Sequence, residues 1–323
     1  MSNREIVAEN LVRQFGNFTA VNGVSFKVKS GEIFGFLGPN GAGKSTTVAM
    51  LTTLILPTTG RATVGGFDVT SQAGDVRRIA GVALQEIGLD PLMKSMELLT
   101  MQAQFFGASR KEATSRAKEL LELVKLSEFT ARPVGKYSGG TRRRLDLAMA
   151  LAHEPEVLFL DEPTTGLDPA SRRDIWHEVR RLNRDHGMTI FLTTQYLEEA
   201  DLLADRIAII DKGIIQAEGT PADLKAGLGG ESINVSFRDA ELALKAAEAV
   251  RDMVTKVQID RRTVRLYLAG AAQAVPGVIN RLGTHGLEPI SLTLSQPTLD
   301  DVFLQVTGQR FEAEPTEDEA LPA

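Results

Sequence analysis

The sequence predicts an α/β fold followed by a smaller α+β domain, and three patterns support this prediction. Short continuous apolar runs at 157–160 (VLFL) and 189–194 (TIFLTT) are typical of strands buried in a parallel sheet. A glycine-rich turn at 38–45, GPNGAGKS, lies between an apolar strand and a helical segment. Beyond residue 230, strand and helix patterns follow one another in the order βαββαβ.

Composition excludes several classes of protein. The 323 residues suffice for one large domain and a small one. A net charge of −6 shows no basic excess, so we expect no binding of nucleic acid. The chain has no cysteine, which excludes disulfides and thiolate metal sites. Its N-terminus is polar and its apolar runs are short, so we expect no signal peptide or membrane span, and a cytoplasmic protein.

The N-terminal elements follow from periodicity. Apolar and polar residues alternate at 24–29 (VSFKVK), which predicts a half-exposed antiparallel sheet in the first 30 residues. The segment 32–37 is an apolar strand that leads into the glycine-rich turn. A helix should span about 44–56, where a proline ends it. The segment 62–69 contains two adjacent glycines and predicts a hairpin.

The remaining elements define the domains. Residues 90–153 are mostly helical by leucine spacing, and 206–219 forms a hairpin around a glycine. AGLGG at 226–230 resembles a linker. The last residues are acidic and contain prolines, which indicates disorder. We therefore predict a domain over 1–225 with a helical subdomain at about 88–155, a C-terminal α+β domain over 231–310, and a disordered acidic tail over 311–323.

The motif GPNGAGKS fits the pattern G-x-x-x-x-G-K-[ST] of a phosphate-binding loop. Its glycines allow the backbone N–H groups to approach a phosphate, and the following helix N-terminus adds positive potential. Lys44 should reach the β and γ phosphates, and Ser45 can hold Mg²⁺. The alternative, a plain glycine-rich turn, fits the strand and helix context less well. The candidate binding residues are Gly38, Asn40, Gly41, Gly43, Lys44, Ser45 and Thr46.

Two acids follow the apolar run VLFL. Asp161 ends a predicted parallel strand beside the phosphate loop, where it can hold Mg²⁺. Glu162 can polarise an attacking water. The alternative is a helix N-cap, since Asp-Glu-Pro suits that position too.

YSGG at 137–140 precedes a helical run. Ser138, Gly139 and Gly140 at a helix N-terminus predict a second anion site, and the alternative is an ordinary N-cap. We expect the arginines at 142–144 to form a solvated, salt-bridged face rather than to bind phosphate.

The order of these motifs resembles the nucleotide-binding subunit of an ATP-binding-cassette (ABC) transporter over roughly residues 4–225. The motifs are GPNGAGKST, Gln85, YSGGT, FLDEP, GLD at 166–168 and TTQYLEEAD. The resemblance implies a P-loop NTPase ABC cassette with an N-terminal antiparallel β subdomain and a helical subdomain. It also implies ATP and Mg²⁺ as ligands. Two copies would dock head to tail, with ATP between the loop of one and the SGG of the other.

Three further residues are assigned by this resemblance. Phe15 matches the aromatic residue that stacks on adenine, and its alternative is packing at a strand edge. Gln85 matches the glutamine that reaches Mg²⁺. Asp168 matches the acid that crosses the dimer interface, although it could equally cap the next helix.

Gln195 in TTQYLEEAD stands where most of the family has a histidine that contacts the γ-phosphate. An amide can donate to phosphate and accept from water, but it cannot act as a base near neutral pH, which leaves Glu162 as the base candidate. None of the four histidines is placed to replace it. The nearest in sequence precedes the strand 189–194, whose six residues separate it from Gln195 by about 20 Å. The alternative is a polar helix cap. The histidines are His153, His177, His186 and His285.

The segments TTQYLEEAD, YSGGTRRRLDLA and QPTLDDVFLQVTG together are similar to the daunorubicin-resistance branch of drug-efflux ATPases. This resemblance implies export of hydrophobic drugs, antibiotics or lipids through a separate integral-membrane permease. The subunit would then lie at the cytoplasmic face of the membrane. The alternative is a soluble ABC-type ATPase that acts as a regulator or in translation or DNA repair.

Overall fold

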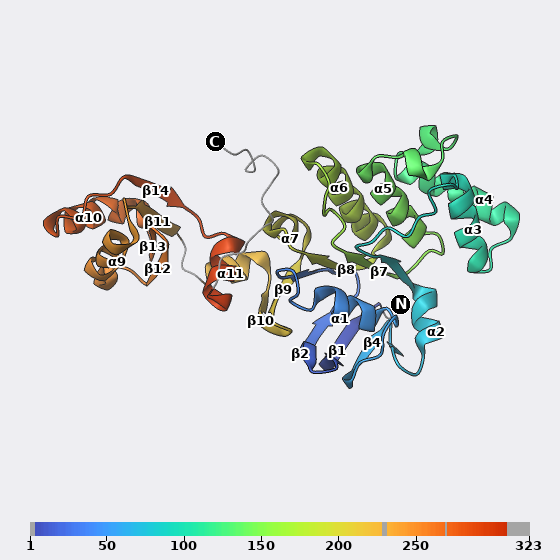
Figure 1. Ribbon diagram of the computed structural model, residues 1–323, viewed down its shortest axis with the longest axis horizontal. Helices are drawn as coiled ribbons and strands as arrows, with labels where there is room; N and C mark the ends of the chain where they lie inside the picture. Colours follow the sequence, from blue (N-terminus) through green and yellow to red (C-terminus); the bar gives the residue numbers. More distant parts are fainter. Residues whose placement is uncertain (1–3, 228–230, 269, 309–323) are drawn as a thin grey trace. The chain divides into compact units, whose positions relative to one another are not determined.

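The computed structural model describes residues 4–227, 231–268 and 270–308, so the predicted acidic tail lies outside the described residues. The chain forms two compact units that divide between Glu218 and Gly219 (Figure 1). The short helix α8 (Pro221–Ala226) therefore belongs to the second unit, where it packs on α11 (Leu299–Thr307). The sequence instead predicts the boundary after α8, because AGLGG at 226–230 resembles a linker.

A six-stranded sheet forms the centre of the first unit in the order β10-β9-β3-β8-β7-β6. Its neighbours β9–β3, β3–β8, β8–β7 and β7–β6 are parallel, which confirms the prediction from the apolar runs. The strands are β3 (Ile33–Leu37), β6 (Ala80–Ala83), β7 (Val157–Asp161), β8 (Thr189–Thr194), β9 (Arg206–Asp211) and β10 (Ile214–Gly219).

Both faces of this sheet are covered, as its continuous apolar strands require. Leu158 and Leu160 of β7 pack into a core that includes residues of α5 (Gly139–Ala150), α6 (Pro169–His186) and α7 (Leu197–Leu203). Phe159, between them, packs into a second core with α1 (Lys44–Leu51). Figure 1 shows α5, α6 and α7 on one side of β7 and β8 and α1 on the other. The alternation of strand side chains thus separates two cores.

An antiparallel sheet of order β2-β1-β4-β5 covers α1, and the predicted alternation and hairpin are confirmed. The predicted length of α1 was wrong. The helix ends at Leu51, because Thr53 adopts a positive φ of 63°, which the right-handed helix does not allow. The strands are β1 (Ile6–Phe15), β2 (Phe18–Val28), β4 (Thr59–Val64) and β5 (Phe67–Asp68), and α2 (Ala73–Ile79) follows them.

The helical part of the first unit combines α3 (Ser95–Phe105), α4 (Arg110–Leu123) and α5. Ser109 and Glu112 form a capping box that fixes the start of α4. Short 3₁₀ turns at Ser127–Phe129 and Val134–Lys136 lead into α5. Within the described residues, no helix is long and apolar enough to cross a membrane.

The second unit has the predicted βαββαβ order. Its antiparallel sheet, ordered β12-β13-β11-β14, shares one apolar core with α9 and α10. The elements are β11 (Glu231–Ser236), α9 (Ala240–Ala249), a 3₁₀ turn (Arg251–Met253), β12 (Lys256–Asp260), β13 (Thr263–Leu268), α10 (Ala271–Thr284) and β14 (Ser291–Ser295).

Candidate functional site

Three neighbouring strands of the parallel sheet end at the same place. In the register, Leu37 of β3 lies opposite Thr194 of β8, and Thr193 lies opposite Asp161 of β7. The glycine-rich loop starts directly after β3, and Gly38 N–H donates to the Thr194 carbonyl. The motifs at 38–45, 161–162 and 193–195 therefore meet at the C-terminal ends of these strands, which is where open α/β sheets bind ligands.

The loop after β3 leaves the start of α1 open. Gly41 and Gly43 adopt φ of 79° and 104°, which favours glycine strongly. A Cβ on Gly43 would lie 2.5 Å from the Ala20 carbonyl oxygen. No side chain caps α1, so its first N–H groups remain available to an anion. This local structure is suited to binding phosphate through the backbone.

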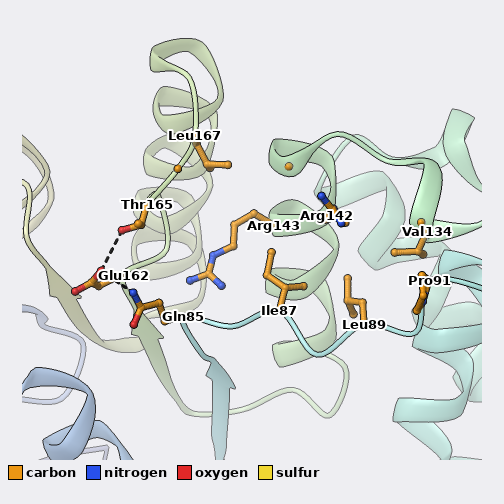
Figure 2. A pocket seen from close by; sticks show the side chains of 13 residues that line it. Gln85, Ile87, Leu89, Pro91, Val134, Arg142, Arg143, Glu162, Thr165 and Leu167 are labelled. Carbon is orange, nitrogen blue, oxygen red and sulfur yellow. Dashed lines mark hydrogen bonds between the residues drawn. The ribbon is translucent and has the colours of Figure 1, made fainter. Parts of the chain in front are cut away.

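Lys44 and Glu162 are buried at these strand ends and form an ion pair. The Lys44 Nζ lies 3.0 Å from Glu162 Oε1 and donates to the carbonyls of Gly38 at 2.7 Å and Pro39 at 3.0 Å. Gln85 Nε2 and Thr165 Oγ1 donate to Glu162 Oε2 at 3.3 and 3.1 Å. Figure 2 shows Gln85 and Thr165 converging on Glu162. Glu162 has a φ of 48°, an uncommon conformation that aims its side chain at the loop lysine and away from a helix-cap geometry.

Asp161 supplies the second carboxylate. It is buried at the end of β7 and accepts a hydrogen bond from the Thr193 hydroxyl. Ser45 is exposed at the start of α1, and Gln85 follows β6. Within the described chain, no three His, Cys, Asp or Glu side chains gather into a metal cluster. The donor set of one carboxylate, one hydroxyl and one amide fits Mg²⁺, which takes few protein oxygens beside phosphate oxygens.

A pocket of about 330 Å³ lies over the start of α1, between the loop residues, Gln85 and Glu162. Phe18, which sequence reasoning missed, lines this pocket and is 62% exposed. Phe15 does not line it. Phe15 lies opposite Phe18 in the β1–β2 register, and its ring is 47% exposed and lies under the Arg13 guanidinium, 4.5 Å away. The two aromatic residues in RQFGNF were the available signal, and the choice between them needed the structure.

The SGG residues lie outside the pocket over α1, although Gly139 lines a neighbouring pocket of about 330 Å³ together with Gln85 and Glu162. None of Ser138, Gly139 and Gly140 lines the pocket over α1. Ser138 is the N-cap of α5, and its hydroxyl accepts from Thr141 N–H at 3.2 Å. Ser138 and Gly139 are exposed, so an anion could still approach from outside.

Asp168 is likewise an N-cap, of α6. Its carboxylate accepts from the N–H groups of Ala170 and Ser171, each at 3.0 Å. The Ser171 hydroxyl is the main cause that lowers the pKa of Asp168. The cap interpretation is thus confirmed for both Ser138 and Asp168, and their ligand or interface roles stay predictions.

Gln195 follows β8 and is only 4% exposed. The alternative of a helix cap was wrong, because the N-cap of α7 is Tyr196. The predicted exclusion of two histidines agrees with the topology. His153 bonds to the Ala80 carbonyl at the start of β6, and His186 ends α6 before β8 begins. Both therefore lie toward the N-terminal ends of the strands, away from Gln195.

The sequence analysis missed a buried acid on α7. Glu199 on α7 accepts from Thr164 Oγ1 at 2.9 Å and from Trp176 Nε1 at 2.8 Å. Burial raises the pKa of Glu199, and these hydrogen bonds oppose that rise.

The prediction for the arginines at 142–144 was wrong for Arg143. Its side chain is buried and bonded to backbone carbonyls near the two acids. Helical spacing carried a signal, because Arg143 falls on the same face of α5 as the buried Gly140, Leu147 and Ala150.

Comparison with known proteins gives two family matches. The ABC transporter family matches residues 21–165, and a family described as ATP-binding protein DrrA1-3-like, C-terminal domain, matches residues 219–307. Daunorubicin resistance ATP-binding protein DrrA3 of Streptomyces coeruleorubidus is 43% identical over 309 residues, 95% of this chain and 97% of that protein. Linearmycin resistance ATP-binding protein LnrL of Bacillus subtilis is 37% identical, over 94% of this chain and 98% of its own.

A solved structure matches the first unit. The dimeric ATP-binding cassette MJ0796, in a post-hydrolysis state with ADP and Pi, has a TM-score of 0.62 and 26% identity. The match covers 67% of this chain and 98% of that chain. The predicted cassette fold is therefore confirmed. Neither the family matches nor the relatives named above support the alternative of an ATPase in translation or DNA repair.

Proposed function

This chain belongs to the family of ABC transporter ATP-binding subunits, which are ATPases, and from this premise we propose that it energises export of hydrophobic drugs or lipids through a separate permease. The relatives named for resistance to daunorubicin and linearmycin support such a substrate class. The observation that carries the chemistry is the buried Lys44–Glu162 pair in the phosphate loop pocket.

The chemistry assigned to each residue follows from its position. Lys44 would exchange its contacts with Gly38 and Glu162 for the β and γ phosphates of ATP. Glu162 would then be free to accept a proton from the attacking water, and Gln195 would hold the γ-phosphate and that water through its amide. Asp161, Ser45 and Gln85 would hold Mg²⁺, which offsets phosphate charge when bound.

The pocket over α1 lacks a second wall that can bind phosphate, because the SGG residues line none of it. We therefore assign Ser138, Gly139 and Gly140 to the ATP of a second copy, which docks head to tail, with Asp168 near the interface. The dimeric cassette among the solved structures supports this arrangement.

A groove of about 370 Å³ in the first unit suits the permease. Leu54, Leu84 and Phe106 line it and are more than a third exposed. Leu84 directly precedes Gln85, so a membrane subunit seated here would touch the chain beside the nucleotide site. We place the subunit at the cytoplasmic face of the membrane for this reason.

Replacement of the acid tests the proposal. Glu162→Gln keeps the shape but cannot take a proton, so ATP hydrolysis in membranes that contain the permease should fall about 1000-fold. ATP should still bind and should trap a dimer that light scattering detects. The matched control is Glu198→Gln, because Glu198 is exposed on α7. Normal turnover in Glu162→Gln would sink the assignment.

A further inference from the structure

One arginine of α5 reaches the backbone around both site carboxylates. Arg143 is 4% exposed. Its Nη2 donates to the Asp161 carbonyl and its Nε to the Pro163 carbonyl, both at 2.9 Å. Its Nη1 donates to the Leu84 carbonyl. Figure 2 shows the guanidinium reaching from α5 toward Glu162 and Gln85.

These three carbonyls occupy particular places in the chain. Asp161 and Pro163 flank Glu162 on both sides, and Leu84 immediately precedes Gln85. The side chains of Gln85 and Glu162 are themselves joined by a hydrogen bond of 3.3 Å. One guanidinium therefore fixes the spacing between the two segments that carry these side chains, and it does so from the helix that begins with SGG.

We propose that Arg143 is a positioning residue for hydrolysis, which ties the placement of α5 to the spacing of Gln85 and Glu162. This inference rests on the function proposed above. Arg143 lies four residues after Gly139, about 6 Å along a rigid helix. When the ATP of a second copy engages Ser138 and Gly139, any shift of α5 reaches the backbone on both sides of Glu162 through this side chain.

The chemistry explains why arginine suits this place. Its planar fork carries five donors, so it can satisfy several carbonyls at once, whereas lysine is a compact charge with three donors. Asp146, one turn away on α5, faces Nη1 at 3.0 Å and offsets the charge. Burial raises the pKa of Asp146 to about 6, and the Arg143 guanidinium opposes that rise. Three of the four hydrogen-bond acceptors of Arg143 are backbone carbonyls, so the carbonyl contacts are its main role.

The test compares Arg143→Lys with Arg143→Met, and the exposed Arg142→Met is the matched control. The kcat for ATP in permease-containing membranes should fall about 10-fold to 100-fold in both Arg143 variants, because hydrogen bonds to a charged group are lost. The KM and the affinity for ATP should stay within about 3-fold. Wild-type kcat in Arg143→Lys overturns the proposal, and so does a fall in ATP affinity equal to the fall in kcat.

A further variant separates the carbonyl contacts from the ion pair. Asp146→Asn leaves the three carbonyls that accept from Arg143 in place, so the kcat of this variant should stay within about 3-fold of wild type. A loss as large as that of Arg143→Lys would mean that the ion pair matters and would overturn the positioning role. Failure of the function itself is recognised separately, because then the wild-type chain has no ATPase activity and Glu162→Gln has nothing to remove.

Discussion

The N-termini of α1 and α5 are both candidate phosphate sites, yet they are built differently. α1 follows a left-handed Gly43, has no side-chain cap, and begins beside the buried pair of Lys44 and Glu162. α5 is capped by its own Ser138 and presents Gly139 to solvent. The first N-terminus therefore has what a single chain needs to bind ATP. The second has a helix dipole and an exposed glycine, and in the proposed dimer its nucleotide is the one that another copy brings.

The largest effect should come from the loop. Lys44→Met removes the buried cation that pairs with Glu162, and charge-assisted bonds to phosphate are lost. We expect ATP affinity to fall about 100-fold, measured by titration with a fluorescent ATP analogue. Lys118→Met, on the exposed side of α4, should bind normally. Unchanged affinity in Lys44→Met would mean that the phosphates bind elsewhere, and the N-terminus of α1 would then be no phosphate site.

Gly139→Ala tests the N-terminus of α5, the second candidate phosphate site. A Cβ here meets only Leu167 Cδ2 at 3.9 Å, so the fold should accept it, and alanine favours helix by about 1 kcal/mol. Gly140 is a poorer choice, because its Cβ would lie 2.6 Å from the Ser171 hydroxyl. ATP binding by one copy should be unchanged while hydrolysis falls about 10-fold or more, as backbone contact is blocked. Normal hydrolysis in Gly139→Ala argues against a ligand at α5.

Gln195→Ala should have an effect of similar size, confined to the chemical step. Loss of one hydrogen bond to a charged phosphate predicts a fall in kcat of about 10-fold to 100-fold, with ATP binding retained. Gln195→His, which supplies the residue usual in the family, should keep kcat within about 3-fold if the role is geometric. Steady-state kinetics of the three proteins decide, and full activity in Gln195→Ala would remove the residue from the mechanism.

The smallest effect belongs to the cap of α5. Ser138→Ala loses the hydrogen bond from Thr141 N–H, which should lower the free energy of unfolding by about 1 kcal/mol. Urea unfolding of the first unit measures this change. ATP binding should be unaffected, and a change in affinity instead of stability would mean that α5 already touches nucleotide in one copy.

The parallel strands and the loop motif could be predicted from sequence because the signal is local. Continuous apolar runs require burial on both faces, and GPNGAGKS needs only the strand before it and the helix after it. The end of α1 could not be predicted from Pro57, because the positive φ of Thr53 ends the helix first.

The missed residues depend on tertiary contacts. Arg143 is one of three successive arginines. Helical spacing places it on the buried face of α5, but its partners Leu84 and Pro163 come from distant segments of the chain. Phe18 and Phe15 are equivalent in sequence, but only the path of the hairpin turns Phe18 toward the loop. Glu199 follows the exposed Glu198 in sequence, and its own burial follows from contact with Trp176 and Thr164.

The most direct test of the central claim, that one working site is shared by two copies, mixes two inactive variants. Lys44→Met disables the loop, and Gly139→Ala disables the SGG end. In a head-to-tail pair of one copy each, one site carries both defects and the other carries none. Co-assembly of equal amounts with the permease should therefore restore about a quarter of wild-type ATP hydrolysis, since half the dimers are mixed and each has one intact site. No recovery in the mixture, with mixed dimers present, would contradict the shared site.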